Sequence, residues 1–214
     1  MKNLIIIGAR GFGREVYHLA TQCQGYLTDF AVKGFLDDQA DALSGRTGYP
    51  PILGAVEAYA VQPGDVFVCA LGSAKFKKHY VGIMLNKGGE FLSLCHPSAM
   101  VNRDSEIGPG AIILANVFVS CEVRLGAFVT IQPFCAIGHD AQIGAYCHLN
   151  AYAFMGGFAE CSEGVTLHTG AKVLPHKKVG AWATVGAGSV VMRNVKPAQT
   201  VFGMPAMAID GIDG

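Results

Sequence analysis

The sequence predicts a small α/β domain of the half-Rossmann kind followed by an all-β domain, a parallel β-helix. Two observations predict this order. The first 95 residues alternate apolar β-type runs with helical stretches, and from Val101 to Val191 every sixth residue is apolar. A period of six fits neither a helix nor a plain strand; it is typical of a parallel β-helix, in which each repeat supplies one short strand and a turn. We place the domains at residues 1–95 and 96–214.

The expected elements of the first domain follow one another in short steps. We expect strands at residues 3–7, 30–36, 66–71 and 91–94, helices at 14–24 and 75–86, and a short helical segment after Ile52-Leu53-Gly54. Strands that alternate with helices indicate a small parallel sheet.

A glycine-rich turn follows the first strand. Gly8, Gly11 and Gly13 would let a phosphate approach the start of the next helix. The acidic pair Asp37 and Asp38 follows Gly13 at about the spacing where a carboxylate would meet a ribose hydroxyl. About 95 residues hold one mononucleotide-binding half, so we favour a nucleotide-linked substrate over NAD. The alternative is a tight strand-to-helix turn that binds nothing.

The six-residue repeat runs without interruption. Its large apolar residues should point into a triangular coil of about 18 residues, with small or β-branched residues near the corners and glycines giving unusual backbone angles there. The sixteen apolar positions are Val101, Ile107, Ile113, Val119, Leu125, Ile131, Ile137, Ile143, Leu149, Met155, Cys161, Leu167, Val173, Val179, Val185 and Val191.

The repeat positions one histidine beside a backbone amide. His139 comes two positions after the inward-facing Ile137, so it should face outward, and Gly157 takes the equivalent place one coil above it. A histidine can serve as general base, a nearby N–H can stabilise an oxyanion, and Asp140 can orient the imidazole. His148, half a coil away, would approach His139 only across a subunit interface. The alternative is a solvated surface histidine.

The composition excludes several classes of function. The formal net charge is zero and basic residues form no run, which argues against nucleic acid and anionic membranes as partners. No apolar stretch approaches the roughly 20 residues of a transmembrane helix. The seven cysteines form no CxxC pair, and we expect Cys135, Cys147 and Cys161, at inward positions of the coil, to be small buried residues in a reducing cytoplasm.

Seven short motifs occur in order along nearly the whole chain. They are Ile7-Gly8-Ala9-Arg10-Gly11-Phe12-Gly13, Gly34-Phe35-Leu36-Asp37-Asp38, Ile52-Leu53-Gly54, Ala70-Leu71-Gly72, His96-Pro97-Ser98-Ala99, Ile137-Gly138-His139-Asp140 and Val201-Phe202-Gly203-Met204-Pro205-Ala206. Together they resemble the NeuD/PglD-type family of sugar O- and N-acyltransferases.

The resemblance implies a left-handed β-helix, a homotrimer with acetyl-CoA bound between neighbouring helices, and a nucleotide sugar held by the N-terminal domain. It makes His139 the catalytic base, with Asp140 in place of the usual Glu. Further residues are implied to bind ligands: His148 the acetyl group, Gly157 the thioester, and Thr169 and Ala187 the pantetheine arm. Lys77 falls where many relatives carry an Arg that would contact the substrate.

These features together predict an acetyl-CoA-dependent N-acetyltransferase that acts on the amino group of a nucleotide-linked amino sugar in glycan biosynthesis, without a metal. One alternative is an O-acetyltransferase of sialic acid or another sugar hydroxyl. A second is a non-catalytic nucleotide-sugar-binding protein, and a third is a trimeric β-helix carbonic anhydrase with zinc on three histidines.

Overall fold

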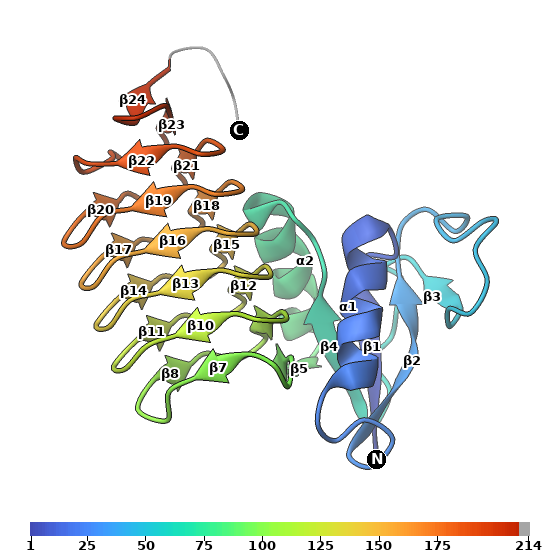
Figure 1. The fold of residues 1–214 in the computed structure, drawn as a ribbon. Helices are drawn as coiled ribbons and strands as arrows, with labels where there is room; N and C mark the ends of the chain where they lie inside the picture. The colour runs from blue at the N-terminus through green and yellow to red at the C-terminus, as the bar shows by residue number, and fades with distance from the viewer. Residues whose placement is uncertain (210–214) are drawn as a thin grey trace. The chain divides into compact units, whose positions relative to one another are not determined.

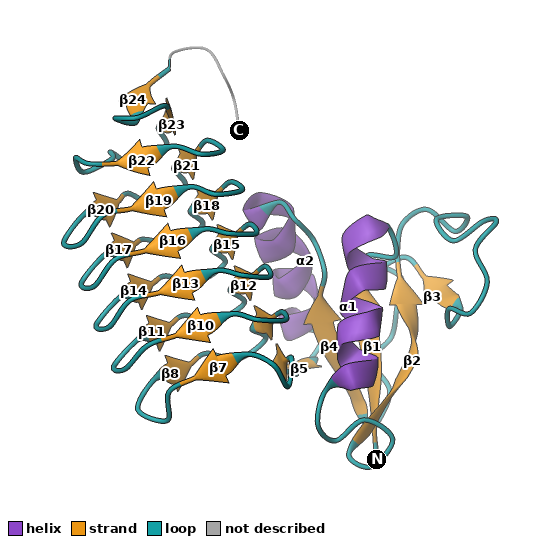
Figure 2. Ribbon diagram, in the orientation of Figure 1, coloured by secondary structure: helices purple, strands orange, loops and turns teal. Residues whose placement is uncertain are grey.

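The computed structural model describes residues 1–209, and the chain divides into two compact units, residues 1–97 and the chain from Ser98 onward. Both helices of the described residues belong to the first unit, and the second is built of short strands (Figure 2). An α/β unit followed by a parallel β-helix is the fold class that the sequence predicts, and the structure confirms it.

The first unit is organised around a five-stranded parallel sheet with the order β3-β2-β1-β4-β5. The central strand β1 is buried on both faces, which explains its unbroken apolar run. Because the chain leaves β1 towards β2 and leaves β4 towards β5, the carboxyl ends of β1 and β4 border a crevice of the kind that binds ligands in such sheets. The strands are β1 (Lys2–Ile7), β2 (Phe30–Leu36), β3 (Ile52–Gly54), β4 (Asp65–Cys69) and β5 (Glu90–Phe91), and β6 (Leu94–Cys95) ends the unit.

Two helices, α1 (Gly11–Gln22) and α2 (Ala74–Asn86), follow β1 and β4. Helix α1 buries Gly13, Val16, Leu19 and Ala20, which lie on one stripe of the helix. Ser73 is the N-cap residue of helix α2, and its hydroxyl accepts a hydrogen bond from the amide of Phe76 at 3.4 Å.

The second unit is a stack of triangular coils whose three sides are three parallel sheets (Figure 1). Each strand pairs in register with the equivalent strand of the next coil, as in Phe118 with Ala136 and Ala136 with Phe154. The first sheet holds β7 (Met100–Val101), β10 (Phe118–Val119), β13 (Ala136–Ile137), β16 (Phe154–Met155), β19 (Lys172–Val173) and β22 (Val190–Val191). The second holds β8 (Glu106–Ile107), β11 (Arg124–Leu125), β14 (Gln142–Ile143), β17 (Glu160–Cys161) and β20 (Lys178–Val179). The third holds β9 (Ile112–Ile113), β12 (Thr130–Ile131), β15 (His148–Leu149), β18 (Thr166–Leu167), β21 (Thr184–Val185), β23 (Thr200–Phe202) and the antiparallel β24 (Met207–Ala208).

The apolar residues of the repeat form the core of this unit. From Ile113 to Val191 every one of them is buried, together with small residues such as Ala141 and Ala159. The two earlier repeat residues are less buried: Val101 is half-buried and Ile107 has 40% of its surface exposed, because β7 and β8 are edge strands with a neighbouring strand on one side only.

Corner glycines such as Gly170 and Gly188 have the positive φ that the sequence suggested, but those directly after an inward residue have a different purpose. Gly138 follows the inward residue Ile137 but does not have a positive φ; an added Cβ there would lie 2.6 Å from the amide nitrogen of Gly157 in the next coil. Gly138 is therefore needed for space. The left-handed conformation comes two positions later, at Asp140 with φ +58°, and most of these corner residues are not glycines.

Three local expectations for the first unit were wrong. Helix α1 begins at Gly11 instead of 14, and the expected strand at 91–94 is split between β5 and β6. The residues after Gly54 form a turn instead of a short helix. There the ammonium group of Lys87 donates to the carbonyl oxygens of Val56, Glu57 and Tyr59 at 3.1, 2.6 and 3.0 Å, so a side chain satisfies groups that a helix would bond internally.

Candidate active site

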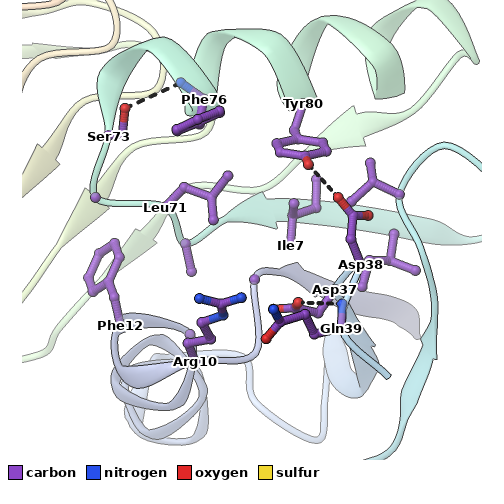
Figure 3. A pocket seen from close by; sticks show the side chains of 16 residues that line it. Ile7, Arg10, Phe12, Asp37, Asp38, Gln39, Leu71, Ser73, Phe76 and Tyr80 are labelled. Carbon is purple, nitrogen blue, oxygen red and sulfur yellow. Dashed lines mark hydrogen bonds between the residues drawn. The ribbon is translucent and has the colours of Figure 1, made fainter. Parts of the chain in front are cut away.

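A cavity of about 560 Å³ lies at the carboxyl ends of β1, β2 and β4, where the strand order reverses (Figure 3). This volume is within the range of small-molecule sites. Arg10 and Phe12 border it from the start of α1, Asp38 from the end of β2, and Ser73 and Tyr80 from α2. The cavity therefore lies where the predicted glycine turn and the acidic residues after β2 meet.

The glycine turn brings α1 against β1. Gly8 has φ +95°, and a Cβ added to Gly13 would lie 1.9 Å from the carbonyl oxygen of Gly8. Gly11 is not restricted in this way, because its added Cβ would meet only Arg14 Nη2, at 4.0 Å. Gly8 and Gly13 line the cavity, whereas Gly11 is not among its lining residues.

The two acidic residues after β2 have different partners. Asp37 accepts hydrogen bonds from the amides of Ala9 and Gln39 at 2.9 and 3.0 Å, so its carboxylate ties the glycine turn to the loop after β2. Asp38 accepts a hydrogen bond from the hydroxyl of Tyr80 on α2 (Figure 3). This hydrogen bond, with partial burial, raises the pKa of Tyr80 to about 12.

Lys77 is not placed to contact a ligand in this cavity. It lies on the buried stripe of α2 with Ala74, Val81 and Met84, is 1% exposed and does not line the cavity. Its charge acts on Cys69, whose pKa burial raises to about 12 while Lys77 lowers it. The expectation of a substrate contact at Lys77 therefore finds no support in the cavity geometry.

The predicted stacking of His139 and Gly157 is present at one corner of the β-helix, which we call the His139 corner (residues 138–140 and 156–158). His139 Nδ1 lies 2.7 Å from Asp140 Oδ2, and both side chains are partly exposed. A Cβ added to Gly157 would lie 2.7 Å from His139 Nε2, so the Nε2 edge of the imidazole faces Gly157. This corner combines a carboxylate-bound imidazole with an adjacent backbone segment that has no side chain.

The amide of Gly157 donates to no acceptor among the described residues. Its position in the coil, two places after an inward residue, is occupied by proline at Pro109, Pro133 and Pro175, which have no N–H to donate. The ladder of hydrogen bonds between coils thus does not use this N–H, which leaves it available to a ligand.

The other predicted acetyl-CoA residues lie elsewhere in the chain. Thr169 and Ala187 are stacked one coil apart, after β18 and β21, at the corner that follows the third sheet, whereas the His139 corner follows the first sheet. His148 lies on β15 of the third sheet, in register with Thr130 and Thr166, and is 4% exposed. One chain therefore does not bring these residues to His139.

A cleft of about 460 Å³ opens beside the His139 corner. Its lining carries the carboxylates of Asp104, Glu106, Glu122 and Asp140 and the guanidinium group of Arg124. The ring of Phe158 also lines it. The excess of carboxylates makes this side of the corner electronegative.

Two further observations concern metals and membranes. Within residues 1–209, no three His, Cys, Asp or Glu side chains are grouped so that they could hold a metal ion, as the zinc alternative would need within one chain. Neither of the helices in this part of the chain is long and apolar enough to cross a membrane.

Known proteins resemble both units. The sequence model of the PglD N-terminal domain matches residues 3–83. A GDP-perosamine N-acetyltransferase of Escherichia coli O157:H7 is 29% identical over 202 residues, which cover 92% of this chain and 81% of that protein.

Two solved structures extend the similarity over almost the full length. A variant of perosamine N-acetyltransferase from Caulobacter crescentus, in complex with CoA and GDP-perosamine, is 25% identical with a TM-score of 0.88 and covers 99% of this chain and 98% of its own. The acetyltransferase domain of PglB from Neisseria gonorrhoeae, in complex with acetyl coenzyme A, is 26% identical with a TM-score of 0.88, covering 97% and 99%. Over almost its full length the chain therefore resembles sugar acyltransferases of the NeuD/PglD type.

The structure adds two residues to the candidate site that no sequence motif indicated. Tyr80 borders the cavity because it lies one turn after Phe76 on α2. Phe158 contacts His139 with ring centroids 5.2 Å apart, although the two residues belong to different coils. The only sequence signal for Phe158 was its place next to Gly157.

Proposed function

We propose that the chain is an acetyl-CoA-dependent N-acetyltransferase that acts on the amino group of a nucleotide-linked amino sugar. The observation that carries this proposal is the His139 corner, where the Nε2 edge of His139 faces Gly157 and Nδ1 is held by Asp140. The relatives named above are sugar N-acetyltransferases or bind acetyl coenzyme A, which supports the same reaction class.

The chemistry follows from this arrangement. With Asp140 accepting a hydrogen bond from Nδ1–H, the lone pair of the neutral imidazole lies on Nε2, where it can take a proton from the attacking amine. The amine forms the C–N bond, and the Gly157 N–H stabilises the negative oxygen of the tetrahedral intermediate. The C–S bond then breaks, and the CoA thiolate leaves with the proton that the His139 imidazolium returns. A neutral amine is nucleophilic enough that no acyl-enzyme is needed.

The cavity of the first unit is the proposed site of the nucleotide. The guanidinium group of Arg10 can pair with phosphate oxygens, and the start of α1 favours an anion because the positive end of the helix dipole lies there. Asp38 and Gln39, on the loop that follows β2, are placed to contact the ribose or the base. The relative from Caulobacter crescentus binds a guanosine diphosphate sugar, which supports a nucleoside diphosphate here.

The charge around the His139 corner favours an amine over a sialic acid as acceptor. The cleft beside it carries four carboxylates and one guanidinium group, a field that attracts an ammonium ion and repels the carboxylate of a sialic acid. An O-acetyltransferase of another, neutral sugar is not disfavoured by this field, so the substrate screen below includes one.

A homotrimer would complete the site. Thr169, Ala187 and His148 do not reach the His139 corner within one chain, so a site that uses all of them needs a second copy. The outer face of the first sheet also exposes the large apolar side chains of Met100 and Phe118 in adjacent strands, and of Phe154 two strands further on, beyond Ala136. An apolar face of this kind fits a neighbouring chain. Light scattering should give three times the mass of one chain, and a monomer at assay concentration would reject the assembly.

The decisive experiment combines a substrate screen with a variant. Purified protein is assayed for CoA release with GDP-, UDP- and dTDP-linked amino sugars, with free sialic acid and with a nucleotide-linked sugar that has hydroxyl groups but no amino group. We expect turnover with one nucleotide-linked amino sugar, and His139→Asn to lower kcat by about 10²- to 10⁴-fold with little change in acetyl-CoA affinity measured by calorimetry. The control is His18→Asn, an exposed histidine outside both cavities. Near-normal turnover by His139→Asn would reject the assignment.

A further inference from the structure

The ring of Phe158 lies against His139 at the His139 corner. The two ring centroids are 5.2 Å apart and the planes are nearly perpendicular, at 89°. The amide of Phe158 also donates to the carbonyl oxygen of His139 at 3.0 Å. Phe158 is thus joined to His139 through both its backbone and its side chain.

A second imidazole covers Phe158 from the next coil. His176 is stacked on Phe158 with centroids 5.0 Å apart and planes 5° from parallel. Both ring contacts of Phe158 are therefore made with histidines, although 46% of its surface is exposed. With these two contacts, the ring of Phe158 is better suited to holding His139 in place than to stacking on a sugar.

Phe158 has φ +57°, in the left-handed region, and several corner residues with this conformation are aromatic. Rings at such corners stack from coil to coil, as Phe128 does on Tyr146 and Phe158 on His176. Besides this stacking, the ring of Phe158 has an edge-on contact with His139. This second contact gives the ring a role beyond the stacking of coils.

The imidazole of His139 can rotate about two side-chain bonds, so a fixed orientation needs more than one contact. Asp140 holds Nδ1 at 2.7 Å, but one hydrogen bond at a partly exposed site leaves the ring free to tilt about it. Phe158 blocks that tilt by a second contact. The glycine at 157 leaves the space into which Nε2 points.

We propose that Phe158 is a positioning residue that keeps Nε2 of His139 directed at Gly157 and so at the proposed reacting amine. The inference rests on the proposed function, because it assumes that His139 is the base. It does not give Phe158 any contact with substrate.

The test replaces Phe158 by asparagine, which suits the left-handed backbone and removes the ring. We expect kcat to fall about 10- to 100-fold, because small displacements of a catalytic group have effects of this size, with the KM for acetyl-CoA unchanged. Phe158→Tyr keeps the ring and should restore most of kcat. In histidine ring ¹⁵N spectra, the share of His139 with its proton on Nδ1 should fall in Phe158→Asn, which a purely structural role would not produce.

The matched control is Tyr146→Asn. Tyr146 has φ +61°, is half-buried and is stacked on Phe128 at the corner that follows the second sheet, where none of the predicted site residues lies. Wild-type kcat in Phe158→Asn, or an equal loss in Tyr146→Asn, would overturn the proposal. If His139→Asn is inactive while Phe158→Asn is normal, only the positioning role fails; if His139→Asn is fully active, the proposed function itself fails.

Discussion

His139 Nδ1 lies 2.7 Å from Oδ2 of Asp140, the residue that follows it in the chain. Two neighbouring residues can meet in this way because Asp140 has φ +58°, which turns its side chain back towards the imidazole. Although Asp140 has a shorter side chain than the usual Glu, its carboxylate reaches the imidazole of His139.

We predict that Asp140→Asn lowers kcat by about 10²-fold or more, because an amide cannot stabilise the imidazolium that forms during proton transfer. Asparagine tolerates the left-handed backbone, so the corner should keep its shape. Asp140→Glu keeps the charge and should retain more activity than Asp140→Asn. Steady-state kinetics with saturating acetyl-CoA measures both, and equal kcat for Asp140→Asn and the wild type would contradict an orienting role.

Gly13 and Gly11 should respond differently to the same substitution. Gly13→Ala places a Cβ 1.9 Å from the carbonyl oxygen of Gly8, so α1 must move away from β1. We expect a loss of about 2–4 kcal/mol in the free energy of unfolding and a loss of nucleotide-sugar binding. Gly11→Ala meets only a flexible arginine end at 4.0 Å and should change stability by less than about 1 kcal/mol. Urea denaturation compares the two, and similar losses would reject the steric explanation.

The Asp38–Tyr80 hydrogen bond predicts a measurable change in a tyrosine pKa. The pKa of Tyr80 is raised to about 12 chiefly by its hydrogen bond to Asp38, so Asp38→Asn should lower it towards the ordinary value near 10. Tyrosine ¹³Cζ NMR over alkaline pH follows this titration directly. Tyr80→Phe identifies the signal, and a tyrosine that titrates alike in the wild type and Asp38→Asn would refute the contact.

A buried carboxylate at the end of the sheet opposite the cavity should make stability depend on acidic pH. Burial would raise the pKa of Asp65, but hydrogen bonds from Lys33, Tyr59 and the amide of Gln62 outweigh it and hold the pKa below its ordinary value. A lowered folded-state pKa means that Asp65 stabilises the fold above the unfolded-state pKa of about 3.9 and loses this contribution as pH falls through the folded-state value.

The corresponding variant is Asp65→Asn. At pH 7 it should cost about 2–3 kcal/mol of unfolding free energy, because Lys33, Tyr59 and Gln62 lose an ionised acceptor. The difference from the wild type should shrink below about pH 4. Denaturant titrations at several pH values measure it, and a difference that stays constant down to pH 3 would contradict the linkage.

The spacing of residues in the sequence predicted those neighbours that depend only on the period of the coil. His139 and Gly157 could be paired from the sequence because strands stack in register from each coil to the next. Contacts that depend on side-chain direction could not be predicted in this way. The contact of Phe158 with His139 is diagonal between coils, and the hydrogen bond of Tyr80 joins a helix to a distant loop.

At Lys77 the helical periodicity and the resemblance to the family indicate different environments. Ala74, Lys77, Val81 and Met84 have the spacing of one helical stripe, and three of the four are apolar. The stripe places Lys77 on the buried face, while the analogy with an arginine in relatives suggested a ligand contact. Local periodicity was the better guide at this position.

The amide of Gly157 occupies a place in the coil that the fold leaves chemically unused, as Pro109, Pro133 and Pro175 demonstrate at equivalent corners. Mutation can therefore change the chemistry of a corner without touching the hydrogen bonds that hold the coils together. In such a scaffold a new specificity can arise at one corner while the rest of the stack is inherited intact, which separates the evolution of activity from the maintenance of stability.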